Sequence, residues 1–184
     1  MKLIFLLLLS LSSFGQTRLI TGPLNATDMN GATVLIDTRT PGGVVLFFTS
    51  ARCPFDDYYI NRMNDLQGRF GRSFRFFWVN SSAEDSPAAM QAEIQDRSTV
   101  IPYLIDHSQA IRKSLGVNKT TEVIVLQPSG NGFIIFYRGP VDDNVQLAAD
   151  ADNSFLKNAL EAYTAGKPAV IPGARVAGCL IRDP

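Results

Sequence analysis

Long apolar runs mark the expected interior strands of this sequence. Residues 44–48 read Val-Val-Leu-Phe-Phe with no polar residue among them, and residues 74–79 are also mostly apolar. A strand without apolar and polar alternation is usually covered on both faces of its sheet. We therefore expect residues 44–48 to form a central strand and residues 74–79 to form a second core strand.

Segments with helical spacing alternate with these strands. Apolar residues recur at helical intervals between Tyr58 and Phe70, and Pro54 suits the first turn of a helix, where its missing N–H costs nothing. A helix is predicted over 54–70. Ser86 and Pro87 begin a second helix that runs to about Arg97. Further helices are predicted over 108–115 and 153–164.

Turn residues predict two hairpins. Asp-Met-Asn-Gly at 28–31 precedes a short strand over 32–37, and Pro-Ser-Gly-Asn-Gly at 128–132 separates strands over 122–126 and 133–138. A short strand over 103–105 completes the order. The pattern predicts an α/β fold, with a central mixed sheet, helices on both faces and an N-terminal β-hairpin.

The two ends of the chain differ from this globular pattern. Lys2, an apolar run over 3–11 and the small residues of Ser13-Phe14-Gly15 are typical of a secretory signal peptide, and the run is too short for a spanning helix. Proline and glycine recur after residue 166, which predicts an extended tail packing on the domain. We expect a signal peptide over 1–15, one domain over 16–166 and a tail over 167–184, with no membrane span after signal removal.

Composition adds little about partners. Seventeen basic residues balance seventeen acidic ones among 184, so the charge does not favour a nucleic acid or an acidic membrane surface. We expect no nucleic-acid partner. The chain is long enough for one domain with an adequate core.

The two cysteines, Cys53 and Cys179, are the candidate chemistry. In an exported protein, periplasmic or extracellular, a disulfide between them can persist. One interpretation is a structural staple. The other is a reactive pair, because Cys53 precedes Pro54 at the predicted start of a helix, where backbone N–H groups stabilise a thiolate. Both interpretations predict the same bond.

Several segments together resemble the thioredoxin superfamily, and within it redoxin or peroxiredoxin-like proteins of the alkyl hydroperoxide reductase and thiol-specific antioxidant type. The resemblance covers most of the mature chain. It is carried by residues 46–54, 80–81, 85–87, 102–106, 137–144 and 178–182. It implies a thioredoxin-like fold and thiol oxidoreductase chemistry.

The sequence also departs from the family's motifs. A Cys-x-x-Cys motif would place a second cysteine where Asp56 stands, and the peroxiredoxin signature has proline at the position of Leu46, although Ser50 fits its Thr or Ser. Relatives carry a cis-proline in a Thr-Pro-Glu sequence. This chain has Thr121 in place of that proline.

The resemblance implies an enzyme with Cys53 as nucleophile and Cys179 as candidate resolving cysteine, in a site lined by Ser50, Arg52, Pro54 and Thr121. No bound cofactor or metal is implied, because sulfur carries the electrons. The expected partners are an external thiol reductant or a disulfide-bearing protein, with peroxide as another substrate.

A second function class stays open. The same fold with a structural Cys53–Cys179 disulfide would be a non-catalytic binding module, which in some thioredoxin-like proteins handles copper. His107 is the one histidine of the sequence, and no further ligand stands at a characteristic spacing from it. A solvated loop position is therefore expected for His107.

Overall fold

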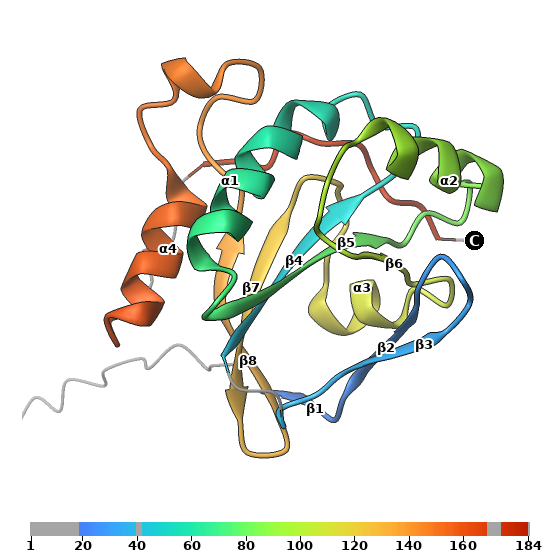
Figure 1. The fold of residues 1–184 in the computed structure, drawn as a ribbon. Helices are drawn as coiled ribbons and strands as arrows, with labels where there is room; N and C mark the ends of the chain where they lie inside the picture. Colours follow the sequence, from blue (N-terminus) through green and yellow to red (C-terminus); the bar gives the residue numbers. More distant parts are fainter. Residues whose placement is uncertain (1–18, 40–41, 169–173, 184) are drawn as a thin grey trace, which may run out of the picture.

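A computed structural model describes residues 19–39, 42–168 and 174–183 (Figure 1). The proposed signal peptide lies outside these residues. The strands are β1 (Leu19–Thr21), β2 (Leu24–Thr27), β3 (Thr33–Ile36), β4 (Gly43–Thr49), β5 (Phe74–Asn80), β6 (Tyr103–Ile105), β7 (Val123–Ser129) and β8 (Gly132–Gly139). The helices are α1 (Ile60–Phe70), α2 (Pro87–Asp96), α3 (Ala110–Leu115) and α4 (Phe155–Thr164), with short 3-10 turns η1 (Asp57–Tyr59) and η2 (Ala148–Asp150).

One mixed sheet joins the eight described strands in the order β1-β8-β7-β4-β5-β6-β2-β3. Strand β4 lies inside it, parallel to β5 and antiparallel to β7. All seven residues of β4 are buried. The predicted central strand is confirmed. The loop that carries Cys53 therefore begins at the end of an interior strand, between β7 and β5.

Successive residues of β4 face opposite layers of core. Val45 and Phe47 pack with side chains of α1, α2 and α4 on one face. Leu46 and Phe48 pack with α3 on the other face. Figure 1 shows α1 and α4 on the same side of the sheet, and α3 across it. Helices on both faces are therefore confirmed.

Both predicted hairpins are confirmed. Strands β2 and β3 pair antiparallel around the turn at Asp28, whose carboxylate accepts from the backbone N–H groups of Asn30 and Ala32. Strands β7 and β8 pair antiparallel across the second turn. Strand β1, which the sequence did not predict, extends the other end of the sheet by pairing with β8.

The helix expected over 54–70 begins later than predicted. Regular α-helix starts at Ile60, after turns over 51–56 and the 3-10 turn η1. The cause is Asp56, whose carboxylate turns back to accept from the Ser50 N–H and the Thr49 hydroxyl. Cys53 consequently lies in a loop and not at a helix N-terminus. By contrast, α2 begins as predicted, with Ser86 capping the Ala89 N–H and Pro87 in the first turn.

No helix within the described residues is long and apolar enough to cross a lipid bilayer.

Candidate functional site

Cys53 is held just beyond the carboxyl end of β4. Its N–H donates to the Ser50 carbonyl at 3.1 Å, and its own carbonyl accepts from the Asp56 N–H at 3.2 Å. The residue is only 4% exposed. Cys53 is positioned by tight loop bonds and not by a helix dipole.

The structure joins Cys53 to Cys179 through a disulfide. Their α carbons are 5.8 Å apart although the residues are 126 positions apart in the sequence. Cys179 is half-buried and therefore more accessible than Cys53. The bond connects the loop after the central strand to the C-terminal tail, which Figure 1 shows in red along the upper end of the sheet.

The tail docks as a short extended strand against residues 118–120. The Thr120 N–H donates to the Cys179 carbonyl at 2.9 Å, the Ile181 N–H donates to the Asn118 carbonyl at 2.9 Å, and Lys119 bridges antiparallel to Leu180. A Cβ on Gly178 would lie 2.0 Å from the Thr120 carbonyl oxygen. Glycine at this position lets the two backbones approach closely.

More distant contacts hold the rest of the tail. The buried Arg112 forms an ion pair with Asp183, and the Gln109 side chain donates to the Arg182 carbonyl at 2.8 Å. Exposed ion pairs contribute little, because water screens them and ordering the side chains has an entropic cost. The backbone pairing, the disulfide and the burial of Ile181 in the core beside α3 are therefore the main attachments of the tail.

Thr120 contacts both cysteines of the disulfide. Its hydroxyl donates to Cys53 Sγ at 3.0 Å and accepts from the Cys179 N–H at 3.0 Å. The family resemblance predicts a site role for the next residue, Thr121, which stands in the place of the family's proline. Thr121 instead donates to the Ala177 carbonyl at 2.6 Å and holds the tail.

The threonine segment keeps a loop geometry without a cis bond. No cis peptide is present in the described residues, and Thr121 adopts φ +60. The Thr121 N–H donates to the Phe48 carbonyl at 2.7 Å, which ties the segment to the end of β4. A left-handed backbone conformation is uncommon at threonine and persists only where the surrounding hydrogen bonds enforce it.

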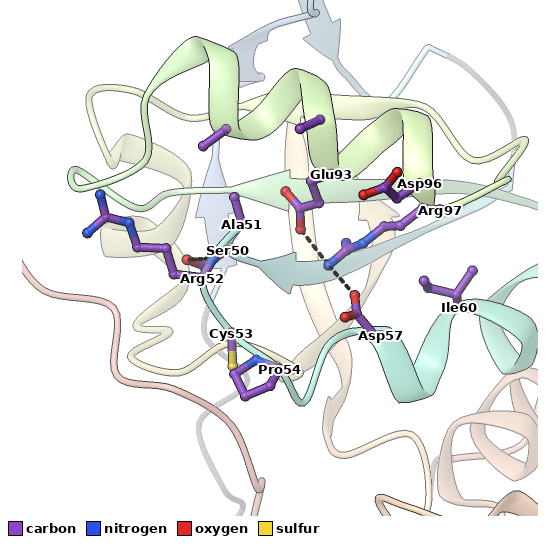
Figure 2. Close-up of a pocket in the computed structure, with 12 residues that line it drawn as sticks. Ser50, Ala51, Arg52, Cys53, Pro54, Asp57, Ile60, Glu93, Asp96 and Arg97 are labelled. Carbon is purple, nitrogen blue, oxygen red and sulfur yellow. Dashed lines mark hydrogen bonds and ion pairs between the residues drawn. The ribbon is translucent and has the colours of Figure 1, made fainter.

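The remaining predicted site residues lie around the Cys53 loop. The Ser50 hydroxyl donates to Asp85 at 3.0 Å, and Arg52 is exposed with its Nε 3.8 Å from the same carboxylate. Pro54 is exposed beside Cys53. Ser50, Arg52 and Pro54 line one cavity with Cys53, as Figure 2 shows.

That cavity has a volume of about 840 Å³ and lies between the Cys53 loop and α2. Figure 2 shows Asp57 and Arg97 pointing toward each other across it, with Glu93 on α2 beside them. Its far wall carries Ile60 and Asp96. The cavity thus offers room for a partner's side chain next to the disulfide.

Asp56 is a buried carboxylate directly behind this site. It is fully buried, and burial raises its pKa to about 7, even though bonds from Ser50 and Thr49 and the charge of Arg97 lower it. The Thr120 hydroxyl also lowers the pKa of Asp56, as the smallest of these effects. The Oδ1 atom of Asp56 is buried without a hydrogen-bond partner. The sequence shows Asp56 in the place of a motif cysteine, and its burial follows only from the fold.

A single buried guanidinium faces this carboxylate. Arg97 has a side chain that is 2% exposed and forms an ion pair with Glu93, while its Nη2 is 3.8 Å from Asp56. Burial raises the pKa of Glu93 also. The sequence placed Arg97 only at the end of a helix, and the apolar periodicity of α2 carried no sign that its side chain turns inward over Trp78.

No group of three or more histidine, cysteine, aspartate or glutamate side chains in the described part of the chain is arranged to hold a metal ion. His107 is exposed in the loop after β6, in agreement with the expected solvated position.

Comparison with known proteins identifies the fold of this chain and not its activity. No protein-family model matches the sequence, and no curated protein matches it. Among solved structures, an uncharacterized conserved protein of Geobacillus kaustophilus is similar with 23% identity and a TM-score of 0.73, over 94% of each chain. A hypothetical protein of Sinorhizobium meliloti has 22% identity and a TM-score of 0.69, over 91% of this chain and 95% of its own.

A further similar structure has a described activity. It is a secreted disulfide oxidoreductase of Mycobacterium tuberculosis, with 15% identity and a TM-score of 0.54, over 76% of this chain and 95% of its own. Likeness at these identities shows shared architecture. Together with the mixed sheet and the cysteine at the end of its central strand, it establishes that this chain has a thioredoxin-like fold.

Proposed function

We propose that the protein is an exported thiol-disulfide oxidoreductase that exchanges the Cys53–Cys179 disulfide with a partner. The observation that carries the proposal is the placement of this bond: it joins the loop after the central strand to the tail, borders a cavity and receives the Thr120 hydroxyl. The similar secreted disulfide oxidoreductase supports it at the level of the fold.

The proposed cycle uses both sulfurs. In the reduced protein, the Cys53 thiolate attacks a disulfide of the partner, forms a mixed disulfide and releases one partner thiolate. The Cys179 thiolate then attacks Cys53 Sγ, closes the internal bond and releases the second partner thiolate. An external dithiol restores the two thiols and is itself oxidised to a disulfide.

The tail is the moving part of this cycle. Cys53 is nearly buried in the oxidised form, in which it is bonded to Cys179 of the docked tail. Breaking the internal bond leaves the tail held by backbone hydrogen bonds, by side-chain bonds from Gln109 and Thr121, by the buried Ile181 and by an ion pair at Asp183. Release of residues 174–183 then exposes Cys53 to a partner.

Exchange is tested by equilibrating the protein with glutathione and dithiol buffers and by following its reaction with a disulfide-containing peptide. We expect a potential above about −300 mV and loss of exchange in Cys53→Ser. Cys179→Ser is expected to trap the mixed disulfide. Absence of exchange in the unmodified protein, with Cys53→Ser behaving identically, would overturn the proposal.

Peroxide reduction is a second reaction that the reduced protein would support, because a thiolate attacks a peroxide oxygen to give a sulfenic acid that Cys179 resolves as a disulfide. The same preparation tests it with hydrogen peroxide. Peroxide consumption that depends on Cys53 would extend the activity. Its absence would restrict the protein to disulfide exchange.

A non-catalytic binding module is the second candidate function. The burial of Cys53 and the 126-residue separation favour a structural staple, because closing a long loop strongly restricts the unfolded chain. Such a bond has a potential below about −300 mV and resists glutathione. The redox titration therefore separates the two functions.

Export completes the proposal. It is supported by the hydrophobic segment in residues 1–15 and by a disulfide of a kind that persists in oxidising compartments. N-terminal sequencing of protein recovered outside the cytoplasm is expected to begin near Gln16.

A further inference from the structure

The C-terminal tail is bound to the domain largely through its own backbone. Between Ala177 and Ile181, four hydrogen bonds of 2.6–3.0 Å join main-chain atoms of the tail to residues 118–121. Bonds of this kind add an extended segment to a backbone edge and do not depend on the side chains of that segment. The edge at residues 118–121 therefore fits any extended peptide whose side chains the surroundings admit.

The Cys53–Cys179 disulfide has the same form as a bond between Cys53 and a separate peptide. An extended segment lies antiparallel on one backbone edge, and the cysteine of that segment is joined to Cys53 Sγ. Disulfide exchange passes through a mixed disulfide between the attacking cysteine and its partner. The docked tail thus shows the arrangement that a partner's segment would have at this stage.

Two positions of the docked segment restrict its sequence. Gly178, directly before the cysteine, has no room for a side chain, because a Cβ would lie 2.0 Å from the Thr120 carbonyl oxygen and 2.9 Å from the Thr121 hydroxyl. Ile181, two residues after the cysteine, is 7% exposed and joins the core on the α3 face of the sheet. Leu180, which precedes it, is 69% exposed. The edge therefore selects glycine before the cysteine and an apolar side chain two residues after it, and leaves the intervening position open.

A carboxylate further along the tail is paired with a buried cation. Arg112 on α3 has a side chain that is 5% exposed, and its Nη2 forms an ion pair with Asp183. Lys113 Nζ lies 3.6 Å from the same carboxylate. No other acidic side chain of the described residues forms an ion pair with Arg112. This end of the site therefore favours an acidic residue four positions after the cysteine.

We propose that residues 118–121 and Arg112 form a binding site for a cysteine-bearing segment of the partner, and that the tail occupies this site as an internal ligand. The selected sequence is Gly-Cys-x-apolar-x-acidic, where x is any residue. The inference rests on the proposed function, because a partner needs this site only if disulfide exchange takes place.

Exchange at this site replaces one docked segment by another. In the reduced protein, the Cys53 thiolate attacks the cysteine sulfur of the partner's segment, forms the mixed disulfide and releases the other sulfur of the partner's bond as a thiolate. The partner's segment takes the edge and the tail is displaced. The Cys179 thiolate then attacks Cys53 Sγ, the tail returns to the edge, and the partner's segment leaves as a thiolate.

The test uses the full chain carrying Cys179→Ser, which leaves Cys53 as the single thiol. The probe is a synthetic peptide of residues 175–183 whose cysteine is linked to glutathione. At equilibrium with both free thiols, mass spectrometry measures the ratio of the peptide adduct to the glutathione adduct of Cys53. A peptide of the same composition, with the residues around the cysteine reordered, is expected to give a ratio at least about tenfold lower.

Three substitutions in the peptide and one control define the site. Gly178→Ala and Ile181→Ser are each expected to lower the ratio about tenfold or more, because the first introduces a clash and the second loses a buried apolar side chain. Asp183→Asn is expected to lower it about two- to fivefold, because the Asp183 side chain is 73% exposed. Leu180→Ser, which changes the exposed neighbour of Ile181, is the matched control and keeps the ratio within about twofold.

Equal ratios for the Gly178→Ala, Ile181→Ser and Leu180→Ser peptides would overturn the inference. The same peptides applied to the reduced unmodified protein compete with its own tail for Cys53 and are expected to keep the same order. Any free thiol forms adducts with these reagents, so the selectivity is measured whether or not the internal disulfide is labile. Failure of the proposed function would appear instead in the redox titration, as a potential below about −300 mV.

Discussion

Asp56 is a buried carboxylate that both shapes the loop carrying Cys53 and titrates inside the protein. Its bonds to Ser50 and Thr49 fold the Cys53 loop back and delay the start of α1. The same burial makes the charged form costly. A residue that shapes the loop therefore also introduces a titration near neutral pH.

The first stability prediction concerns this residue. Because burial raises the Asp56 pKa above its unfolded value, the folded state binds the proton more tightly. Its contribution to stability is fully present below about pH 4 and is lost as the pH rises through about 7. Asp56→Asn is expected to raise the free energy of unfolding at about pH 8 by roughly 2–4 kcal/mol, with little change at about pH 4.

Urea unfolding of the unmodified protein and of Asp56→Asn, at about pH 4 and about pH 8, measures this difference in unfolding free energy. Asp65→Asn, which removes an exposed carboxylate on α1, is the matched control. It is expected to change the unfolding free energy by no more than about 0.5 kcal/mol at either pH. Equal destabilisation by Asp56→Asn at both pH values would show that the loop bonds outweigh the cost of the buried charge.

Residue roles in the site were only partly predictable from the sequence. Cys53 could be placed at the end of a core strand, because the apolar run before it is unambiguous. The contact of Thr120 with the Cys53 sulfur could not be predicted, since it depends on how the loop before β7 packs against the end of β4. Asp56 and Arg97 are buried because they lie next to each other in the folded protein. The spacing of apolar residues along the sequence gives no sign of such a contact.

At the scale of elements, the tail and the 118–120 segment form the contact on which the site depends. Gly178 packs directly on the Thr120 carbonyl, with no room for a side chain. The pairing is too short to be recognised from sequence pattern. Most regular elements, by contrast, were predictable, because long apolar runs and strong turn residues define β4, β5 and both hairpins.

The Gly178 contact gives a direct prediction. Gly178→Ala would place Cβ 2.0 Å from the Thr120 carbonyl oxygen and is expected to push the tail away from the sheet edge. The equilibrium constant for forming the Cys53–Cys179 bond in a glutathione buffer is expected to fall about tenfold or more, which corresponds to about 1.4 kcal/mol.

Gly68→Ala is the matched control for this prediction. A Cβ at Gly68 meets nothing within 4 Å, and alanine favours the helix interior. This variant is expected to keep the disulfide equilibrium and to raise the unfolding free energy by up to about 1 kcal/mol. An unchanged disulfide equilibrium in Gly178→Ala would contradict the packing argument.

For the whole molecule, the disulfide closes a loop that includes the four described helices and four of the eight described strands. Residues 53 and 179 are joined across 126 positions, from the end of β4 to the tail. Such a constraint reduces the entropy of the unfolded chain more strongly as the loop lengthens. The bond is expected to stabilise the fold whether or not it also exchanges with a partner.

Reduction is therefore expected to lower the free energy of unfolding by roughly 2–5 kcal/mol. Chemical unfolding with and without a dithiol at fixed pH measures the loss, and Cys179→Ser should match the reduced protein. Coincident curves for the oxidised and reduced forms would show that the bond adds no stability and acts only in exchange.

The same bond has a consequence for damage to the chain. Because Cys53 and Cys179 enclose α1 to α4 and strands β5 to β8, one proteolytic cut between them opens a covalent ring and leaves both pieces attached. A cut protein would keep its mass under non-reducing electrophoresis and separate into fragments only after reduction. In an extracellular setting, the redox state of this one bond would decide whether a nicked molecule is retained as a unit or dispersed.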